Sequence, residues 1–235
     1  MKQIIMASTS TIHGSGYLEY LHPELEVFFK NITNILFIPY ARPGGISHDA
    51  YTEIAQKGFS KIGKNITGIH TYNNPIEAVK NAEAIFTGGG NTFVLANQLY
   101  KNQLIEPIRD ALFNGTKYLG TSAGSNICGL TMNTTNDMPI VYPPSFKTLG
   151  MVPFNLNPHY LDPVPGDNHM GETRETRIKE FHQFNTQPVV GLREGSWLHI
   201  ENENITLKGE LTGRVFECGK TPYEIETGSS LNNLK

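Results

Sequence analysis

The sequence predicts an α/β fold: a doubly wound, mostly parallel sheet with antiparallel strands at its C-terminal edge. Three observations predict it. Short apolar runs alternate with segments of helical periodicity over the first half of the chain. The spacing between these runs leaves room for the crossover helices that parallel strands require. From residue 189 onward the runs are short and separated by turn residues, which is typical of antiparallel strands.

The first elements alternate as this fold requires. Gln3–Ala7 is a short apolar run and predicts the first strand, and leucines at helical spacing predict a helix over Tyr17–Lys30. Ile35–Pro39 predicts the second strand, which a Pro-Gly-Gly loop closes. Ser47 is a typical N-cap, so the next helix is expected to begin there and to end near Ile62.

Further strands and helices complete the first half. Proline is tolerated in the first turn of a helix, so Asn74-Pro75 predicts a helix start, and glycines after the fourth strand end that run. The expected elements are, in order, a strand at Asn65–Thr71, a helix at Pro75–Ala82, a strand at Ala84–Thr87, helices at Thr92–Tyr100 and Leu104–Phe113, and a strand at Lys117–Thr121.

The second half has a different character. Thr131–Pro158 is rich in Pro, Asn and Thr and indicates loop, with a strand-like run at Gly150–Phe154, and Glu172–Phe184 predicts a helix. We expect one more strand of the main sheet and then antiparallel edge strands, at Val189–Leu192, Trp197–Glu201, Ile205–Lys208, Val215–Cys218 and Tyr223–Glu226. Because no linker or repeat interrupts the chain, residues 1–235 are expected to form a single domain.

Composition excludes several classes of function. A 38% hydrophobic content argues against disorder, and a net charge of −3 without a basic run argues against a nucleic-acid partner. No apolar run approaches the length of about 20 residues that spans a membrane. Cys128 and Cys218 cannot form a disulfide framework or, alone, a thiolate zinc site, so we expect a reducing compartment. No motif in the sequence implies a metal or organic cofactor.

The motif that carries chemistry follows the fifth strand. Gly120-Thr121-Ser122-Ala123-Gly124 has the Gly-x-Ser-x-Gly pattern of a nucleophile elbow, and a helix can start directly after it. Small neighbours are needed because the serine must be raised on a strained turn. The amide of Ala123, at a helix N-terminus, is placed to face a developing oxyanion. A tight strand-to-helix turn without catalysis is the alternative interpretation.

A glycine-rich loop follows the fourth strand and is expected at the same sheet edge. Its glycines would let the backbone approach a bound group closely, so the amides of Gly89 and Gly90 are candidates to complete the oxyanion hole. A phosphate-binding loop is the rival interpretation. It is disfavoured because Phe93 stands where a Gly-x-Gly-x-x-Gly pattern would continue.

A nucleophilic serine needs a base and a group that orients the base. His159 follows the strand-like run in Asn157-Pro158-His159, which would bring it to the active edge if that strand is parallel to the others. Glu194 follows the strand Val189–Leu192, and Asp137 lies in the loop region after the elbow. Either carboxylate could accept the imidazole N–H, and either could instead be solvated.

Together these motifs resemble the peptidase E family. Five motifs occur along the chain in the same order as in that family: Gly88-Gly89-Gly90-Asn91-Thr92, Ser122-Ala123-Gly124, Thr134-Thr135-Asn136-Asp137-Met138-Pro139, Asn157-Pro158-His159 and Gly171-Glu172-Thr173-Arg174. The resemblance extends from the first strand to at least Trp197. The family contains α-aspartyl dipeptidases, which are serine peptidases with a flavodoxin-like fold similar to class I glutamine amidotransferases. The sequence departs from bacterial members at Thr121, where they carry Trp, and this position bears on substrate fit.

The resemblance implies a cytoplasmic dipeptidase that cleaves Asp-X dipeptides through an acyl-enzyme intermediate. A monomer and a homodimer are both compatible with the sequence. It implies Ser122 as nucleophile and His159 as general base. For the third catalytic residue it leaves both carboxylates and favours Glu194. Asp137 would then meet the substrate ammonium or support the site.

Two arginines are candidates for the substrate carboxylate. A guanidinium is the natural partner of an aspartyl side chain. Arg174 and Arg177 are three residues apart and therefore neighbours on one face of the predicted helix. Alone they indicate a solvated helix face. The resemblance favours Arg174 as the substrate-binding residue and keeps Arg177 as a second candidate.

Other functions are compatible with parts of this pattern. A cyanophycinase-like hydrolase of aspartyl polymers would need an open groove, whereas the short chain favours a dipeptidase. A glutamine amidotransferase subunit would need Cys at the elbow, where Ser122 stands, and Cys128 is expected in the core. A non-catalytic binding domain is the remaining alternative. The candidate serine, histidine and carboxylates argue against it.

Overall fold

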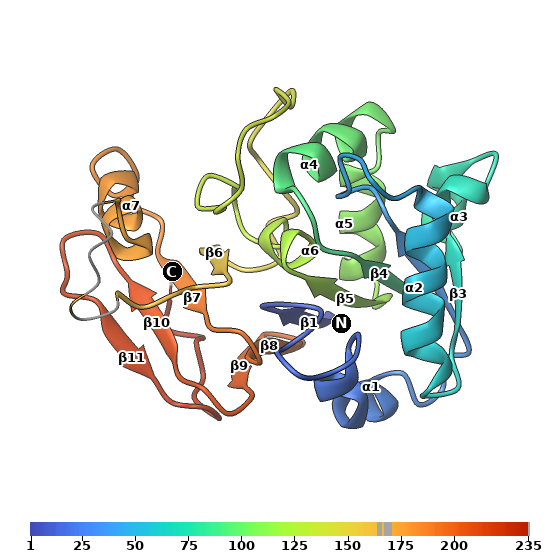
Figure 1. Cartoon of the computed structure of the whole chain (residues 1–235), viewed down its shortest axis with the longest axis horizontal. Coiled ribbons are helices and arrows are strands. Elements are labelled where there is room, and N and C mark those ends of the chain that lie inside the picture. The colour runs from blue at the N-terminus through green and yellow to red at the C-terminus, as the bar shows by residue number, and fades with distance from the viewer. Residues whose placement is uncertain (164–165, 167–170, 235) are drawn as a thin grey trace.

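Two β-sheets organise the chain in this computed structural model, which describes residues 1–163, 166 and 171–234 (Figure 1). Within those residues the larger sheet has the order β3-β2-β4-β5-β1-β8-β9. Its strands are β1 (Gln3–Ala7), β2 (Asn34–Ile38), β3 (Asn65–Gly68), β4 (Ala84–Thr87), β5 (Lys117–Thr121), β8 (Trp197–Glu201) and β9 (Asn204–Lys208). Strands β1 to β5 pair in parallel, and β8 and β9 add the antiparallel edge that the sequence predicts.

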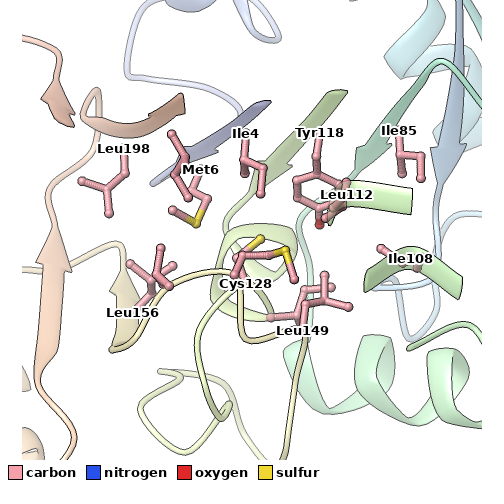
Figure 2. Close-up of a cluster of buried hydrophobic side chains, with 14 of the residues drawn as sticks. Ile4, Met6, Ile85, Ile108, Leu112, Tyr118, Cys128, Leu149, Leu156 and Leu198 are labelled. Carbon is pink, nitrogen blue, oxygen red and sulfur yellow. The ribbon is translucent and has the colours of Figure 1, made fainter. Parts of the chain in front are cut away.

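Helices cover both faces of the larger sheet because its strands alternate between two apolar cores. In β1, Ile4 and Met6 belong to one core and Ile5 and Ala7 to the other. The first core packs against α3 (Pro75–Lys80), α4 (Thr92–Lys101), α5 (Ile105–Phe113) and α6 (Ala123–Asn126). The second packs against α1 (His22–Phe28) and α2 (His48–Ser60). Figure 2 shows part of the first core, with Ile4, Met6, Ile85 and Tyr118 from the strands in a row above Cys128, Leu149 and Leu156.

The second sheet is smaller and was not predicted. Its order is β11-β10-β7-β6, formed by β6 (Asn155–Pro158), β7 (Val189–Leu192), β10 (Gly213–Phe216) and β11 (Tyr223–Ile225). Strands β6 and β7 pair in parallel, and the other pairs are antiparallel. The helix α7 (Arg174–Phe181) packs on this sheet through Ile178, which belongs to a buried cluster with Tyr160, Val189 and Phe216.

Several expected elements differ from the structure. The helix predicted over Tyr17–Lys30 is interrupted because Leu18 has a φ of 58°, so a 3-10 turn at Glu19–Leu21 precedes α1. Strand β3 ends at Gly68, and a 3-10 turn follows at Ile69–Thr71.

The other differences concern the second sheet. The run Gly150–Phe154 bends, because Gly150 has a φ of 60° and Met151 donates to the Cys128 carbonyl; the strand before His159 is β6 instead. Strand β7 pairs with β6 rather than joining the main sheet. Strands β10 and β11, expected at the antiparallel edge of the main sheet, extend the second sheet beside β7 instead. Each helix in the described part of the chain is too short or too polar to span a bilayer.

Candidate active site

Ser122 lies at the turn between β5 and α6 in a backbone conformation that residues other than glycine rarely adopt. Its φ is 52° and its ψ is −111°. A Cβ on Gly120 would lie 2.4 Å from the Gly124 carbonyl oxygen, and one on Gly124 would lie 2.2 Å from that of Thr87. The Gly-x-Ser-x-Gly spacing therefore reflects backbone contacts on both sides of a strained serine.

A second serine fastens this turn, and sequence reasoning missed it. Ser125 is fully buried, and its Oγ lies 2.6 Å from the Ala7 carbonyl oxygen and 2.8 Å from that of Gly120. The amide of Ser122 donates to the same Ala7 carbonyl at 3.1 Å. The elbow is thus attached to the end of β1. A small polar residue one turn inside the elbow helix was the available signal.

The structure brings His159 and Glu194 to Ser122. Nε2 of His159 lies 3.0 Å from Ser122 Oγ, and Nδ1 lies 2.7 Å from Glu194 Oε1. The side chains of His159 and Glu194 are 37% and 47% exposed. An acid, an imidazole and a hydroxyl in one row can move a proton from the hydroxyl to the ring, which is the arrangement that activates a serine.

Neighbouring parallel strands account for the meeting of the imidazole and the carboxylate. β6 ends opposite the end of β7, with Pro158 in register with Leu192, so the residues that follow emerge at one edge. Buried Ser8 joins these two ends: its Oγ accepts from the His159 amide at 2.9 Å and donates to the Leu192 carbonyl at 2.8 Å. Ser8 was not predicted, although its place directly after β1 marks this edge.

Asp137 lies at the start of α4 and is not a hydrogen-bond partner of the His159 ring. Its Oδ2 accepts from the Thr92 amide at 2.7 Å and from Thr135 Oγ1 at 3.0 Å. Both ring nitrogens of His159 already have other partners. Of the two carboxylates that the sequence left open, the structure places Glu194 at the imidazole and Asp137 at the α4 N-terminus.

The glycine-rich loop lies against the serine. A Cβ on Gly89 would be 3.0 Å from Ser122 Cβ, and one on Gly90, whose φ is +147°, would be 2.3 Å from the Ala41 carbonyl oxygen. Only glycine leaves these approaches open. Within the described part of the chain, the amides of Gly89, Gly90 and Ala123 donate no hydrogen bond to another protein group.

Buried Tyr51 orients one of these amides. Its hydroxyl donates to the Gly89 carbonyl at 3.0 Å. In a planar trans peptide the carbonyl and the N–H point in opposite directions, so the Gly90 N–H faces away from Tyr51. The arrangement therefore leaves the candidate oxyanion donors available beside the nucleophile.

The two arginines differ in their surroundings. Arg174 is the first residue of α7 and is half-buried, whereas Arg177 is exposed, with its Nε 3.7 Å from Glu172 Oε2. Burial lowers the pKa of the Arg174 guanidinium, the charge of Arg177 lowers it further, and the carboxylate of Asp137 raises it. The guanidinium stays protonated at neutral pH.

The two cysteines lie apart and unpaired. Cys128 is fully buried, and this burial raises the pKa of its thiol well above the ordinary value, so it is not a reactive thiolate. No group of three His, Cys, Asp or Glu side chains within the described ranges is arranged to hold a metal ion.

Comparison with known proteins gives consistent results. A family model described as peptidase family S51 matches residues 4–208. Peptidase E of Streptomyces coelicolor is 45% identical over 98% of this chain and 94% of its own length. A Drosophila melanogaster protein named "Probable alpha-aspartyl dipeptidase" is 44% identical over 99% of this chain and 97% of its own. The crystal structure of a peptidase from an acI-B1 actinobacterium has a TM-score of 0.73 at 16% identity, covering 98% and 96% of the two chains, and supports the fold.

Proposed function

The chain belongs to peptidase family S51 and is a serine peptidase, and from this membership we propose that it hydrolyses Asp-X dipeptides through an acyl-enzyme intermediate. The observation that carries the proposal is the row of Ser122, His159 and Glu194, with contacts of 3.0 and 2.7 Å. The names of two relatives, peptidase E and alpha-aspartyl dipeptidase, support the choice of substrate.

Acylation follows from this row of contacts. His159 donates a hydrogen bond from its Nδ1–H to Glu194 and therefore keeps a free lone pair on Nε2. This lone pair takes the Ser122 hydroxyl proton as Oγ attacks the peptide carbonyl. The carbonyl oxygen becomes an oxyanion that the amides of Gly90 and Ala123 stabilise. When the tetrahedral intermediate collapses, His159 gives its Nε2 proton to the leaving amine. An aspartyl ester on Ser122 remains.

Deacylation repeats the same proton path with water. His159 takes a proton from a water molecule, the hydroxide attacks the ester carbonyl, and the proton returns to Ser122 Oγ as aspartate leaves. Each bond that the serine forms in the first half is broken in the second. Hydrolysis of one dipeptide therefore consumes one water molecule and leaves the enzyme unchanged.

Selectivity for aspartate is assigned to the charges beside the site. Arg174 would bind the side-chain carboxylate of the substrate, because a half-buried guanidinium loses much of its free energy of hydration and favours a fixed anionic partner. Asp137 would meet the free ammonium group. Arg177 is exposed and would contribute less.

We further propose that residues 1–235 act as one catalytic domain. Ser122 follows β5 of the larger sheet, whereas His159 and Glu194 follow strands of the smaller one. Neither sheet alone holds the reacting groups. A cytoplasmic location is proposed on the redox argument from the two unpaired cysteines.

The test is hydrolysis of Asp-Leu, Asn-Leu, Leu-Leu, N-acetyl-Asp-Leu and a polyaspartate peptide by the wild type and by Ser122→Ala. We expect cleavage of Asp-Leu alone, lost in the variant. Cleavage of polyaspartate instead would favour the cyanophycinase-like alternative. If the folded wild type cleaved none of these peptides, the proposal that Asp-X dipeptides are its substrates would be refuted.

Arginine variants separate the two candidates for the substrate carboxylate. Arg174→Leu should remove the preference for Asp-Leu over Asn-Leu, while Arg177→Leu, a matched change one turn further along α7, should keep it. An unchanged preference in Arg174→Leu would remove this residue from the substrate site.

A further inference from the structure

Arg193, the residue before Glu194, holds more partners than its neighbour does. Nε and Nη2 donate to Asp162 Oδ2 and Oδ1 at 2.7 and 2.8 Å, as a two-pronged pair. Nη1 and Nη2 donate to Glu224 Oε2 and Oε1 at 2.8 and 3.1 Å. Nη1 also lies 2.8 Å from both the carbonyl oxygen and Oγ1 of Thr212. The side chain is only 16% exposed.

These contacts join the segments that carry the imidazole and its carboxylate. Asp162 lies three residues after His159. The Arg193 guanidinium carbon also lies 5.6 Å from the ring centre of Tyr160, the buried residue that follows His159. One guanidinium thus binds the chain after His159 while its own backbone continues into Glu194.

The site needs such an external support. The side chains of His159 and Glu194 are 37% and 47% exposed, so packing around them does little to fix their positions. The backbone of His159 has a φ of 54°, a conformation that persists only where its surroundings hold it. Proton transfer tolerates small errors only, since a displacement of about 1 Å can cost about 10² in rate.

The same network continues to the helix that carries Arg174. Arg214 on β10 donates through Nη1 to Glu224 Oε1 at 3.0 Å, and through Nε and Nη2 to Glu175 Oε2 at 3.2 and 2.9 Å. Glu175 follows Arg174 in the first turn of α7. An unbroken chain of charges therefore leads from the loop of His159 to the start of α7.

We propose that Arg193 is a positioning residue that holds His159 and Glu194 in the geometry required for proton transfer, an inference that rests on the proposed serine mechanism. Through Glu224, Arg214 extends the same support to the start of α7 and hence to Arg174. Exposed ion pairs contribute little to stability, but this guanidinium is mostly buried and is bound on both sides. Its loss is therefore expected to lower stability as well as kcat, and each variant is assayed below its melting temperature.

The first test compares Arg193→Lys with Arg109→Lys. Lysine keeps the charge but cannot form the two-pronged pair. We expect Arg193→Lys to lower kcat for Asp-Leu by about 10- to 100-fold with KM changed by less than about threefold. Arg109 pairs with Glu106 at 3.5 Å on α5, outside this network, and its variant should keep wild-type kcat. A kcat of Arg193→Lys equal to that of Arg109→Lys would overturn the proposal.

A second variant separates positioning of the triad from positioning of the substrate. Arg214→Lys loosens the start of α7 without touching Arg193 directly, so KM should rise while kcat stays near wild type. A general loss of structure would instead change kcat in both arginine variants together, and would be seen as unfolding by circular dichroism at the assay temperature.

A double-mutant cycle distinguishes action through the carboxylate from general damage. If Arg193 acts by positioning Glu194 and His159, Arg193→Lys should lower kcat only a little further in a Glu194→Gln background. The reason is that the carboxylate which Arg193 positions is already absent from that background. Effects that multiply in full would contradict the proposal.

A substrate-independent reaction keeps this test separate from the proposed function. Phosphonylation of Ser122 by a fluorophosphonate needs the serine and His159 but no aspartyl substrate. The wild type should be labelled about 10- to 100-fold faster than Arg193→Lys even if no dipeptide is cleaved. Should Arg193→Lys not fold, Asp162→Asn removes one prong at the His159 side and should slow labelling in the same direction; equal rates would refute the role.

Discussion

Replacement of Glu194 by Gln should lower kcat for Asp-Leu by about 10²- to 10³-fold without unfolding the protein. The change removes the charge that lies 2.7 Å from His159 Nδ1 and keeps the shape of the side chain. An amide can turn its N–H toward Nδ1 and stabilise the wrong tautomer, in which Nε2 carries the proton and cannot accept one from Ser122.

The magnitude lies between two limits. In a buried serine triad the equivalent acid-to-amide change costs about 10⁴ in kcat. A hydrogen bond to a charged group contributes about 1.5–3 kcal/mol, which corresponds to a factor of about 10–10². The side chains of His159 and Glu194 are 37% and 47% exposed, so water can replace part of the lost interaction, and the expected value falls between these limits.

The assay measures initial rates of Asp-Leu hydrolysis, with kcat and KM separated and the melting temperature of each variant determined. Asp137→Asn is the matched control. It keeps an acceptor for the Thr92 amide, so α4 should retain its start, and kcat should fall less than about tenfold while KM rises. A larger loss of kcat in Asp137→Asn than in Glu194→Gln would refute the assignment of the orienting role.

Three further predictions concern stability. Gly90→Ala should lower the free energy of unfolding by about 2–5 kcal/mol in urea titrations, because its Cβ would lie 2.3 Å from the Ala41 carbonyl oxygen at a φ of +147°; a stable variant would contradict this geometry. Ser8→Ala should cost about 1–3 kcal/mol and reduce kcat, because it leaves a buried amide and a carbonyl without their hydroxyl. Hydrogen bonds from Arg193 lower the pKa of Glu224 to about 2. Its ion pairs should therefore stabilise the fold fully above about pH 4.5 and progressively less toward pH 2, so the melting temperatures of wild type and Glu224→Gln should converge as the pH falls; a constant difference would refute this coupling.

The elbow could be predicted because everything it needs is contiguous. Gly120, Ser122 and Gly124 act through the turn they form together, and their spacing appears directly in the sequence. The helix start at Ser47 was predicted for the same reason, since an N-cap acts on an amide only three residues away, and the Ser47 side chain accepts such a bond. The next helix start was predicted from Pro75, and in the structure Asn74 caps that helix as well.

The partners of the serine were harder to assign because long-range pairing brings them together. His159 was selected as a residue after a strand, but that strand is Asn155–Pro158 rather than Gly150–Phe154, and it pairs in the second sheet. Local pattern could not choose between Glu194 and Asp137, since both follow short runs near turns. The register of β6 with β7 brings Glu194 to His159, and this register cannot be predicted from either segment alone.

Arg193 could not be identified from sequence at all. Its acidic partners, Asp162 and Glu224, lie 31 residues before it and 31 residues after it. Each alone looks like a solvated surface charge. Only the folding of β6, β7 and β11 into one sheet places these charges around a single guanidinium.

The division of the site between two sheets also determines when a growing chain acquires it. Synthesis proceeds from the N-terminus at about 5–20 residues per second, so the strands that present Ser122 emerge first. His159 must wait for β7 to supply its neighbouring strand, and Arg193 must wait for Glu224, 31 residues later. The nucleophile is therefore present on the nascent chain before its base is held in place, and proteolytic clipping ahead of β11 would remove that support while leaving the serine untouched.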